Sequence, residues 1–292
     1  MKKIITSLSC ILFTLSFFCM TGCRKSSDGA AQIQEFPKEL SDQIKPDTKR
    51  NEYNFVIMSP LGMDSPVIKY RMDGKVCYML VDTGCLDNWL IKKGIEKIFS
   101  GMTFPMDYVY PNKYVTGQVE GLEYILEAEV FSDVVPDEVD GILGLSWLWK
   151  NNRAVEQNDN VVFDYVNNKI LFNQKPITED SVSLVYDTFV SKYKIPFMFN
   201  DRELYGYLDT GCYCTSIGQR LDEEKDENGV YIVKDFAIGN VHYENNVLSN
   251  VREGRIVDSS KRFMTTNNII GYPCFKDHII QLDFKNNVFR IK

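Results

Sequence analysis

The residues of this chain best suited to chemistry form a repeated tetrapeptide, Asp-Thr-Gly-Cys. Its two copies are Asp82-Thr83-Gly84-Cys85 and Asp209-Thr210-Gly211-Cys212. Two carboxyl groups held about 3 Å apart cannot both be ionised comfortably, so such a pair shares one proton. One member can then act as a base while the other acts as an acid. The repeat therefore indicates a site built on paired carboxylates.

An internal duplication gives the two aspartates equivalent positions. Sixty residues after each aspartate lies a second matching element, Ile142-Leu143-Gly144 in the first half and Ile269-Ile270-Gly271 in the second. The halves are in register over this span at an offset of 127 positions. At the same offset, Met72-Asp73-Gly74-Lys75 and Phe199-Asn200-Asp201-Arg202 read as hairpin turns that enter the Asp-bearing strands. Each copy of the motif is therefore expected to supply half of one site.

The duplication continues downstream with a change of offset. Asn167-Asn168 and Asn286-Asn287 are both flanked by apolar residues. Asparagine tolerates the positive φ angles of a tight hairpin, so both pairs predict turns. The offset between them is eight residues shorter than before, so the first half carries a short insertion after Gly144.

Strand signals dominate the elements that must position these residues. Runs rich in Val, Ile, Tyr and Phe predict strands at 53–57, 76–81, 124–131, 161–163, 169–172, 230–238 and 278–284. Short helices are expected within Leu90–Phe99 and at Trp147–Trp149. A hydrophobic content of 44% and a charged content of 25% are ordinary for a folded chain. We expect an all-β chain with minor helix.

These features together resemble the pepsin/retropepsin type of aspartic protease, and most closely bacterial retropepsin-like proteins with two fused lobes. The resemblance covers residues 52 to 292 and is carried by Val81-Asp82-Thr83-Gly84, Leu208-Asp209-Thr210-Gly211, Gly141-Ile142-Leu143-Gly144 and Asn268-Ile269-Ile270-Gly271. It implies a bilobal pepsin/retropepsin-like acid-protease fold with two duplicated β-barrel-like lobes, an N-terminal lobe at 52–176 and a C-terminal lobe at 177–292.

The resemblance also implies a role for each part of the motif. Asp82 and Asp209 would form a catalytic dyad, while Thr83 and Thr210 would lock the paired loops together. Gly84 and Gly211 would let the backbone turn closely beneath the carboxylates. The strands at 142–144 and 269–271 would thread through the Asp-bearing loops. The implied activity is an endopeptidase that binds an extended, largely apolar peptide in an interlobe cleft and hydrolyses it with a dyad-activated water.

The cysteine that follows each glycine departs from the family pattern, which usually has Ser, Thr or Ala there. A thiol is a weak donor, so any bond from Cys85 or Cys212 to a carboxylate should be feeble. Most cysteines of the exported chain are expected to be small buried apolar residues. The alternative is redox control, because oxidation of Cys85 or Cys212 would crowd the dyad. In that case mild peroxide should lower activity and a reductant restore it.

A flap over the substrate is expected in the first half. Turn residues separate strand-like runs at 110–117, and Tyr110 or Tyr114 is the candidate flap aromatic. The alternative is that these tyrosines simply pack on a half-buried sheet.

The N-terminal residues predict export and lipidation. Lys2 and Lys3 precede the apolar stretch Ile4–Phe18, which fits a secretory signal. Met20-Thr21-Gly22-Cys23 resembles a bacterial lipobox, so 1–22 would be the signal peptide and Cys23 the lipidated residue. The polar residues 23–51 then read as a flexible tether. We expect a cell-envelope lipoprotein, anchored in the bilayer through Cys23, in the outer membrane or at the cell surface.

Other chemistries find little support. The chain has two histidines, His242 and His278, without a cluster of partners, which argues against a zinc hydrolase. A Cys–His protease would pair Cys85 or Cys212 with His242, and nothing in the spacing recommends it. No Gly-x-Ser-x-Gly elbow and no phosphate-binding glycine loop occurs. The net charge of −7 argues against nucleic-acid binding. No cofactor and no metal is expected.

Three functions remain open on the sequence. The first is a monomeric, membrane-anchored aspartic endopeptidase whose site forms between its own two lobes. The second is a catalytically silent lipoprotein that uses the same bilobal scaffold to bind peptides or a surface partner. The third is an interaction protein whose lobes do not face each other, or pair only by dimerisation. Intact Asp, Thr and Gly in both copies favour the first.

Overall fold

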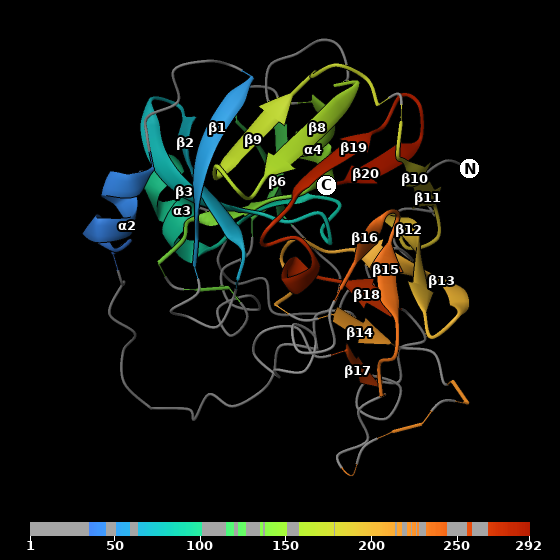
Figure 1. The fold of residues 1–292 in the computed structure, drawn as a ribbon. Helices are drawn as coiled ribbons and strands as arrows, with labels where there is room; N and C mark the ends of the chain where they lie inside the picture. Colours follow the sequence, from blue (N-terminus) through green and yellow to red (C-terminus); the bar gives the residue numbers. More distant parts are fainter. Residues whose placement is uncertain are drawn as a thin grey trace, which may run out of the picture.

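The computed structural model describes residues 35–44, 51–58, 64–100, 115–119, 122–126, 135–136, 138–150, 158–177, 179–213, 215–217, 221–222, 224–225, 227, 232–243, 256–258 and 268–292. Over these residues the chain is mostly β-strand with a few short helices, and its strands form two curled sheets (Figure 1). The expectation of an all-β chain with minor helix is confirmed.

The first half is built around a β-hairpin that ends at the first Asp-Thr-Gly-Cys. Strands β1 (Glu52–Ile57), β2 (Pro66–Met72) and β3 (Lys75–Val81) form an antiparallel meander. Asp73 and Gly74 have φ angles of 47° and 75°, as the predicted tight turn between β2 and β3 requires. Strand β7 (Gly141–Leu143) lies between β3 and β4 (Asn88–Leu90), parallel to β3 and antiparallel to β4. Strands β6 (Leu122–Leu126) and β5 (Val115–Val119) extend this edge.

The second half repeats this arrangement. Strands β12 (Lys192–Phe199) and β13 (Arg202–Leu208) form a hairpin whose turn residues Asn200 and Asp201 have positive φ angles of 46° and 64°. Strand β18 (Asn268–Ile270) is parallel to β13 and antiparallel to β14 (Thr215–Ile217), which is parallel to β17 (Ile256–Asp258). The parallel–antiparallel–parallel order therefore matches β3–β7–β4–β6 of the first half.

Further short strands complete the second sheet. Strand β11 (Val185–Asp187) and strand β15 (Phe236–Ile238) both pair with β12, and β16 (Val241–His242) pairs with β15. All of these pairings are antiparallel.

Within the described part of the chain, one pair of strands joins the two halves. Strands β8 (Asn160–Asp164) and β9 (Lys169–Phe172) form a hairpin, and so do β19 (Ile279–Asp283) and β20 (Val288–Ile291). Strand β19 pairs antiparallel with β8, while β9 pairs with β1 and β20 with β10 (Val182–Ser183). The C-terminal hairpin therefore continues the sheet of the first half, and Figure 1 shows β19 beside β8.

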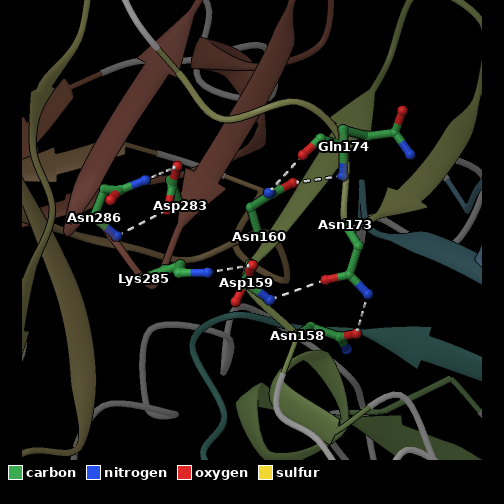
Figure 2. A network of polar contacts seen from close by, with 8 residues as sticks. All are labelled: Asn158, Asp159, Asn160, Asn173, Gln174, Asp283, Lys285 and Asn286. Atoms are coloured by element: carbon green, nitrogen blue, oxygen red, sulfur yellow. Dashed lines mark hydrogen bonds and ion pairs between the residues drawn. The ribbon is translucent and has the colours of Figure 1, made fainter.

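Polar side chains close the ends of these joining hairpins (Figure 2). The Asn160 amide donates to the Gln174 carbonyl and its carbonyl oxygen accepts from the Gln174 backbone N–H, both at 2.9 Å. Lys285 and Asp159 form an ion pair across the halves at 2.9 Å. Because both members are largely exposed, this pair adds little stability. The network therefore positions the chain at the junction and adds little to the free energy of unfolding.

The duplicated Asn-Asn turns behave as predicted. Asp283 accepts two hydrogen bonds from Asn286, and Asp164 accepts two from Asn167, at 2.8 to 2.9 Å. The second asparagine of each pair has a positive φ, 54° at Asn168 and 55° at Asn287. The aspartate holds the turn and the asparagine supplies the left-handed residue.

Short helices follow the Asp loop and the glycine strand, as expected. Helix α3 is Lys92–Ile98, α4 is Leu145–Lys150 and the 3-10 helix η4 is Tyr272–Cys274. Helix α4 places Trp147 in the core, where its ring makes edge contacts with Tyr53, Tyr70 and Phe172. Burial of such an aromatic cluster is a main source of stability in this half.

The segment at 35–44 differs from the flexible tether expected for 23–51. It contains helix α2 (Lys38–Gln43), and Phe36 stacks on Tyr78 with ring centroids 4.0 Å apart. The Ser41 hydroxyl lies 2.7 Å from the Tyr78 hydroxyl, and Ile44 is buried. These apolar residues look scattered in the sequence, yet removing them from water favours docking over a free tether.

The remaining N-terminal expectations lie outside the described residues, including the signal peptide at 1–22 and the lipidation site Cys23. No helix in the part of the chain that the structure describes is long and apolar enough to span a membrane.

Candidate active site

Each aspartate stands at the end of the central strand of its half. Asp82 follows β3 and its backbone N–H donates to the Leu143 carbonyl at 3.0 Å. Asp209 follows β13 and its N–H donates to the Ile270 carbonyl at 3.1 Å. The strands predicted to support the aspartates, with Ile142 and Leu143 in β7 and Ile269 and Ile270 in β18, thus lie directly beside them.

The two aspartates lie next to each other within one chain. A Cβ atom added to Gly84 would be 2.5 Å from the Asp209 Cγ, and one added to Gly211 would be 2.6 Å from the Asp82 Cγ. Real Cβ atoms do not come so close, so each carboxyl group occupies space that only glycine leaves open. Each carboxyl group therefore packs against the loop of the other half.

The two threonines cross-link the loops. The Thr83 backbone N–H donates to the Thr210 Oγ1 at 3.0 Å, and the Thr210 N–H donates to the Thr83 Oγ1 at 3.0 Å. Each hydroxyl donates in turn to the opposite strand, Thr83 to the Leu208 carbonyl at 3.1 Å and Thr210 to the Val81 carbonyl at 3.0 Å. All four bonds are buried, so they fix how the two half-sites face each other.

The glycines that follow the threading strands are held by a matching pair of side chains. The Gly144 N–H donates to the Asn88 Oδ1 and the Gly271 N–H to the Thr215 Oγ1, both at 3.1 Å. The next backbone N–H in each half, that of Leu145 or of Tyr272, donates to the carbonyl of the motif cysteine at 2.8 or 2.9 Å. The spacing of 127 residues also relates Asn88 to Thr215, and it would have identified them in the sequence.

The environment of Asp82 disfavours ionisation of its carboxyl group. Its side chain is 3% exposed. Burial and then the charge of Asp209 raise the pKa of Asp82 well above its ordinary value, while Lys192 and the Gly84 N–H act in the opposite direction. The Gly84 N–H donates to the Asp82 Oδ1 at 2.6 Å. A buried carboxyl group in contact with a second one thus retains a proton at a pH where an exposed aspartate has lost it.

The two motif cysteines are buried near the aspartates, and neither forms a disulfide. Cys85 is fully buried and Cys212 is 3% exposed. Burial, followed by the charge of Asp82, raises the pKa of Cys85 well above its ordinary value. The thiolate is the reactive form of cysteine, so this environment disfavours oxidation. Redox control at Cys85 or Cys212 stays a prediction that the burial of both thiols speaks against.

Other sequence candidates lie elsewhere or are not described. Tyr110 and Tyr114, the flap candidates, fall outside the described residues, as does Cys23. His242 is largely exposed and lies 3.3 Å from Asp235, whereas Cys85 is fully buried. A Cys–His catalytic pair therefore has no geometric support. No group of three or more His, Cys, Asp or Glu side chains that could hold a metal occurs among the described residues.

Two buried polar residues near the pair were missed in the sequence, Ser65 and Lys192. The Ser65 hydroxyl donates to the Gly211 carbonyl at 3.1 Å, and the charge of Lys192 acts on Asp82. The offset of 127 residues relates these two positions to each other, which is the signal that would have drawn attention to them.

Comparison with protein families and curated proteins gives no basis for assigning a function, so the assignment depends on the residues of the site. No protein-family model matches the chain, and no curated protein matches it.

Proposed function

We propose that this chain is an aspartic endopeptidase of the pepsin/retropepsin type, with two lobes that each contribute one aspartate. The observation that carries the proposal is the contact of Asp82 and Asp209 on loops cross-linked by Thr83 and Thr210. The repeated strand order of the two halves supports the bilobal fold. Because the loops pair within one chain, a dimer is not needed to assemble the site.

The proposed chemistry uses the two carboxyl groups as one unit. The ionised member takes a proton from a water molecule, and the protonated member donates to the carbonyl oxygen of the scissile peptide bond. The water attacks directly, so no covalent enzyme intermediate forms. The titrations belong to the pair rather than to either residue. Burial of Asp82 supports this chemistry, since it keeps one proton bound and strengthens the electrostatic interactions.

The proposed substrate is an extended peptide or protein segment bound between the lobes. The protein would work outside the cytoplasm, held to a membrane by a lipid on Cys23, as the N-terminal sequence predicts.

A peptide-cleavage assay tests the function. A peptide library is incubated with the wild-type protein between about pH 3 and about pH 7, the range in which carboxyl pairs titrate. The same assay is run on Asp82→Asn and Asp209→Asn, each of which removes one ionisable group with little change of shape. We expect cleavage by the wild type, inhibition by a statine-type compound and loss of all cleavage in both variants.

Matched controls are available in the hairpins that precede the motif. Asp73 and Asp201 are exposed turn residues with positive φ in equivalent positions of the two halves, and asparagine is readily accommodated there. Asp73→Asn and Asp201→Asn should cleave at the wild-type rate. Cleavage that persists in Asp82→Asn or Asp209→Asn would refute the proposed function.

A further inference from the structure

Lys192 occupies a position beside the aspartate pair that is set by strand register. It is the first residue of β12, and the β12–β13 pairing places Lys194 opposite Tyr207. Continuing the register by two residues brings Lys192 opposite Asp209. Lysine side chains are almost never buried unless they are paired, yet Lys192 is only 8% exposed. A lysine so largely removed from water needs an oppositely charged neighbour, and the strand register places Asp209 opposite it.

The equivalent position of the first half shows where such a side chain can reach. In the β2–β3 pairing Val67 lies opposite Leu80, and continuing by two residues brings Ser65 opposite Asp82. Ser65 is fully buried and its hydroxyl crosses to the other half, where it donates to the Gly211 carbonyl. A side chain at this register position thus reaches the motif loop of the opposite half.

Lys192 stands at the same register position with a longer, charged side chain. Its positive charge acts on Asp82 and on Cys85, both of which belong to the motif loop of the first half. The duplication is therefore broken in charge beside the aspartates, where the neutral Ser65 on one side corresponds to the cationic Lys192 on the other. The pair is chemically asymmetric although its backbone is nearly symmetric.

We propose that Lys192 is a positioning residue of the aspartate pair, whose ammonium group holds the pair in its singly ionised form toward the acidic end of the working range. This role rests on the proposed function, because the singly ionised pair is the form that activates water and donates to the carbonyl. Lys192 itself takes part in no bond-making step.

The direction of the effect follows from the groups that face the pair. Burial and the charge of Asp209 disfavour ionisation of Asp82, and the ammonium of Lys192 opposes both effects. Among the described residues, the charge of Asp82 also acts on the thiol of Cys85 and on the hydroxyl of Tyr165. Asp187 lies opposite Lys192 in β11, where it accepts hydrogen bonds from Lys194 and Tyr207. Removing the Lys192 charge should therefore make both protons of the pair harder to lose.

The pH dependence of cleavage tests this role. Lys192→Met keeps the length of the side chain and removes its charge, Lys192→Arg keeps the charge, and Lys194→Met removes a charge two residues away on the same strand. We expect both limbs of the kcat/KM profile of Lys192→Met to move to higher pH by roughly one unit. Lys192→Arg should restore the wild-type profile, and Lys194→Met should not change it. An unchanged profile in Lys192→Met would overturn the role.

A second measurement separates this role from the proposed function. The aspartate carboxyl carbons are followed by NMR during a pH titration of the wild type, Lys192→Met and Lys192→Gln, after urea unfolding has shown that each variant folds. An upward move of the pair's titration in both variants supports the role even if the wild type cleaves no peptide, in which case only the proposed function fails. If the aspartate pair titrates at the wild-type pH in both folded variants, the role of Lys192 is refuted whatever the cleavage assay gives.

Discussion

Replacing Thr210 by valine removes one hydroxyl from the cross-link between the motif loops and keeps the shape of the side chain. Two buried hydrogen bonds disappear with it: the one it accepts from the Thr83 N–H and the one it donates to the Val81 carbonyl. Thr210 itself is fully buried, so water does not readily replace the hydroxyl. The Thr83 N–H is left without its partner in the opposite loop.

The expected loss in the free energy of unfolding follows from these two hydrogen bonds. A buried donor or acceptor that loses its partner costs about 1–3 kcal/mol, so two such groups cost roughly 2–6 kcal/mol. This is a large part of the 5–15 kcal/mol or so by which a typical folded domain is stable. Activity should fall as well, because the spacing of Asp82 and Asp209 depends on the same cross-link.

Equilibrium unfolding in urea measures the change, with Thr188→Val as the control. Thr188 is an exposed residue after β11, where loss of a hydroxyl should change the free energy of unfolding by less than about 0.5 kcal/mol. If Thr210→Val is destabilised by no more than this control, the reasoning about the cross-link is refuted.

A double-mutant cycle tests whether the two threonines act as one unit. Thr83→Val removes the other two bonds of the cross-link, those to the Leu208 carbonyl and from the Thr210 N–H. The two single variants share no hydrogen bond, yet each loosens the geometry on which the other depends. We expect the double variant to lose less than the sum, by about 0.5–3 kcal/mol. Strict additivity would mean that the cross-link consists of independent bonds.

Further changes probe the carboxyl pair, its glycines, the docked N-terminal segment and the anchor. The raised pKa of Asp82 stabilises the fold below the unfolded-state pKa of about 3.9, and this stability is lost as the pH rises toward the folded-state pKa. Urea titrations should therefore show that the free energy of unfolding of the wild type declines above about pH 4, and that the decline is weaker in Asp82→Asn. At pH 7 the variant should be more stable than the wild type by at least about 1 kcal/mol. An equal decline in both proteins would contradict the assignment of the decline to Asp82. Gly211→Ala should lower kcat/KM by more than about 100-fold, since its Cβ would lie 2.6 Å from the Asp82 Cγ and small displacements at a reacting centre are costly; near-normal activity would show that the loop has room. Phe36→Ala should lose about 3–5 kcal/mol on thermal or urea unfolding while cleavage persists, because the variant removes the ring that stacks on Tyr78; no change would mean that α2 is not docked in solution. Cys23→Ser should move the protein from the membrane fraction to the soluble fraction, and retention in the membrane would exclude the lipid anchor.

Much of the local structure could be predicted from neighbouring residues. The turns at Asp73-Gly74 and Asn200-Asp201 were read from residue types that accept positive φ, and their φ angles agree. The strands expected at 53–57, 76–81, 161–163, 169–172 and 278–284 and the two short helices were found from apolar and β-branched runs. The strand expected at 230–238 is wrong at 232–235, because only Phe236–Ile238 pairs with a neighbouring strand. Such features depend on interactions between residues close in sequence, so the sequence carries them directly.

The docking of residues 35–44 could not be predicted in the same way. Phe36 and Ile44 are isolated apolar residues in a polar segment, and composition alone indicates a tether. Their partner is the face of the sheet around Tyr78, which no local pattern connects with them. The pairing of β8 with β19 is of the same kind, since it joins strands more than 100 residues apart.

By itself, the sequence determined that the chain carries two equivalent half-sites, because the repeat fixes the aspartate, the turn glycine and the supporting strand in each half. Only the tertiary structure decided that the halves meet within one chain, and which other groups reach the pair. Ser65 and Lys192 are equivalent in the repeat, yet one is a hydroxyl that binds a carbonyl and the other is a buried cation that acts on Asp82. The physical reason is that burial and electrostatic coupling arise from neighbours across strand pairs and across the two halves, where distance along the chain gives no guide.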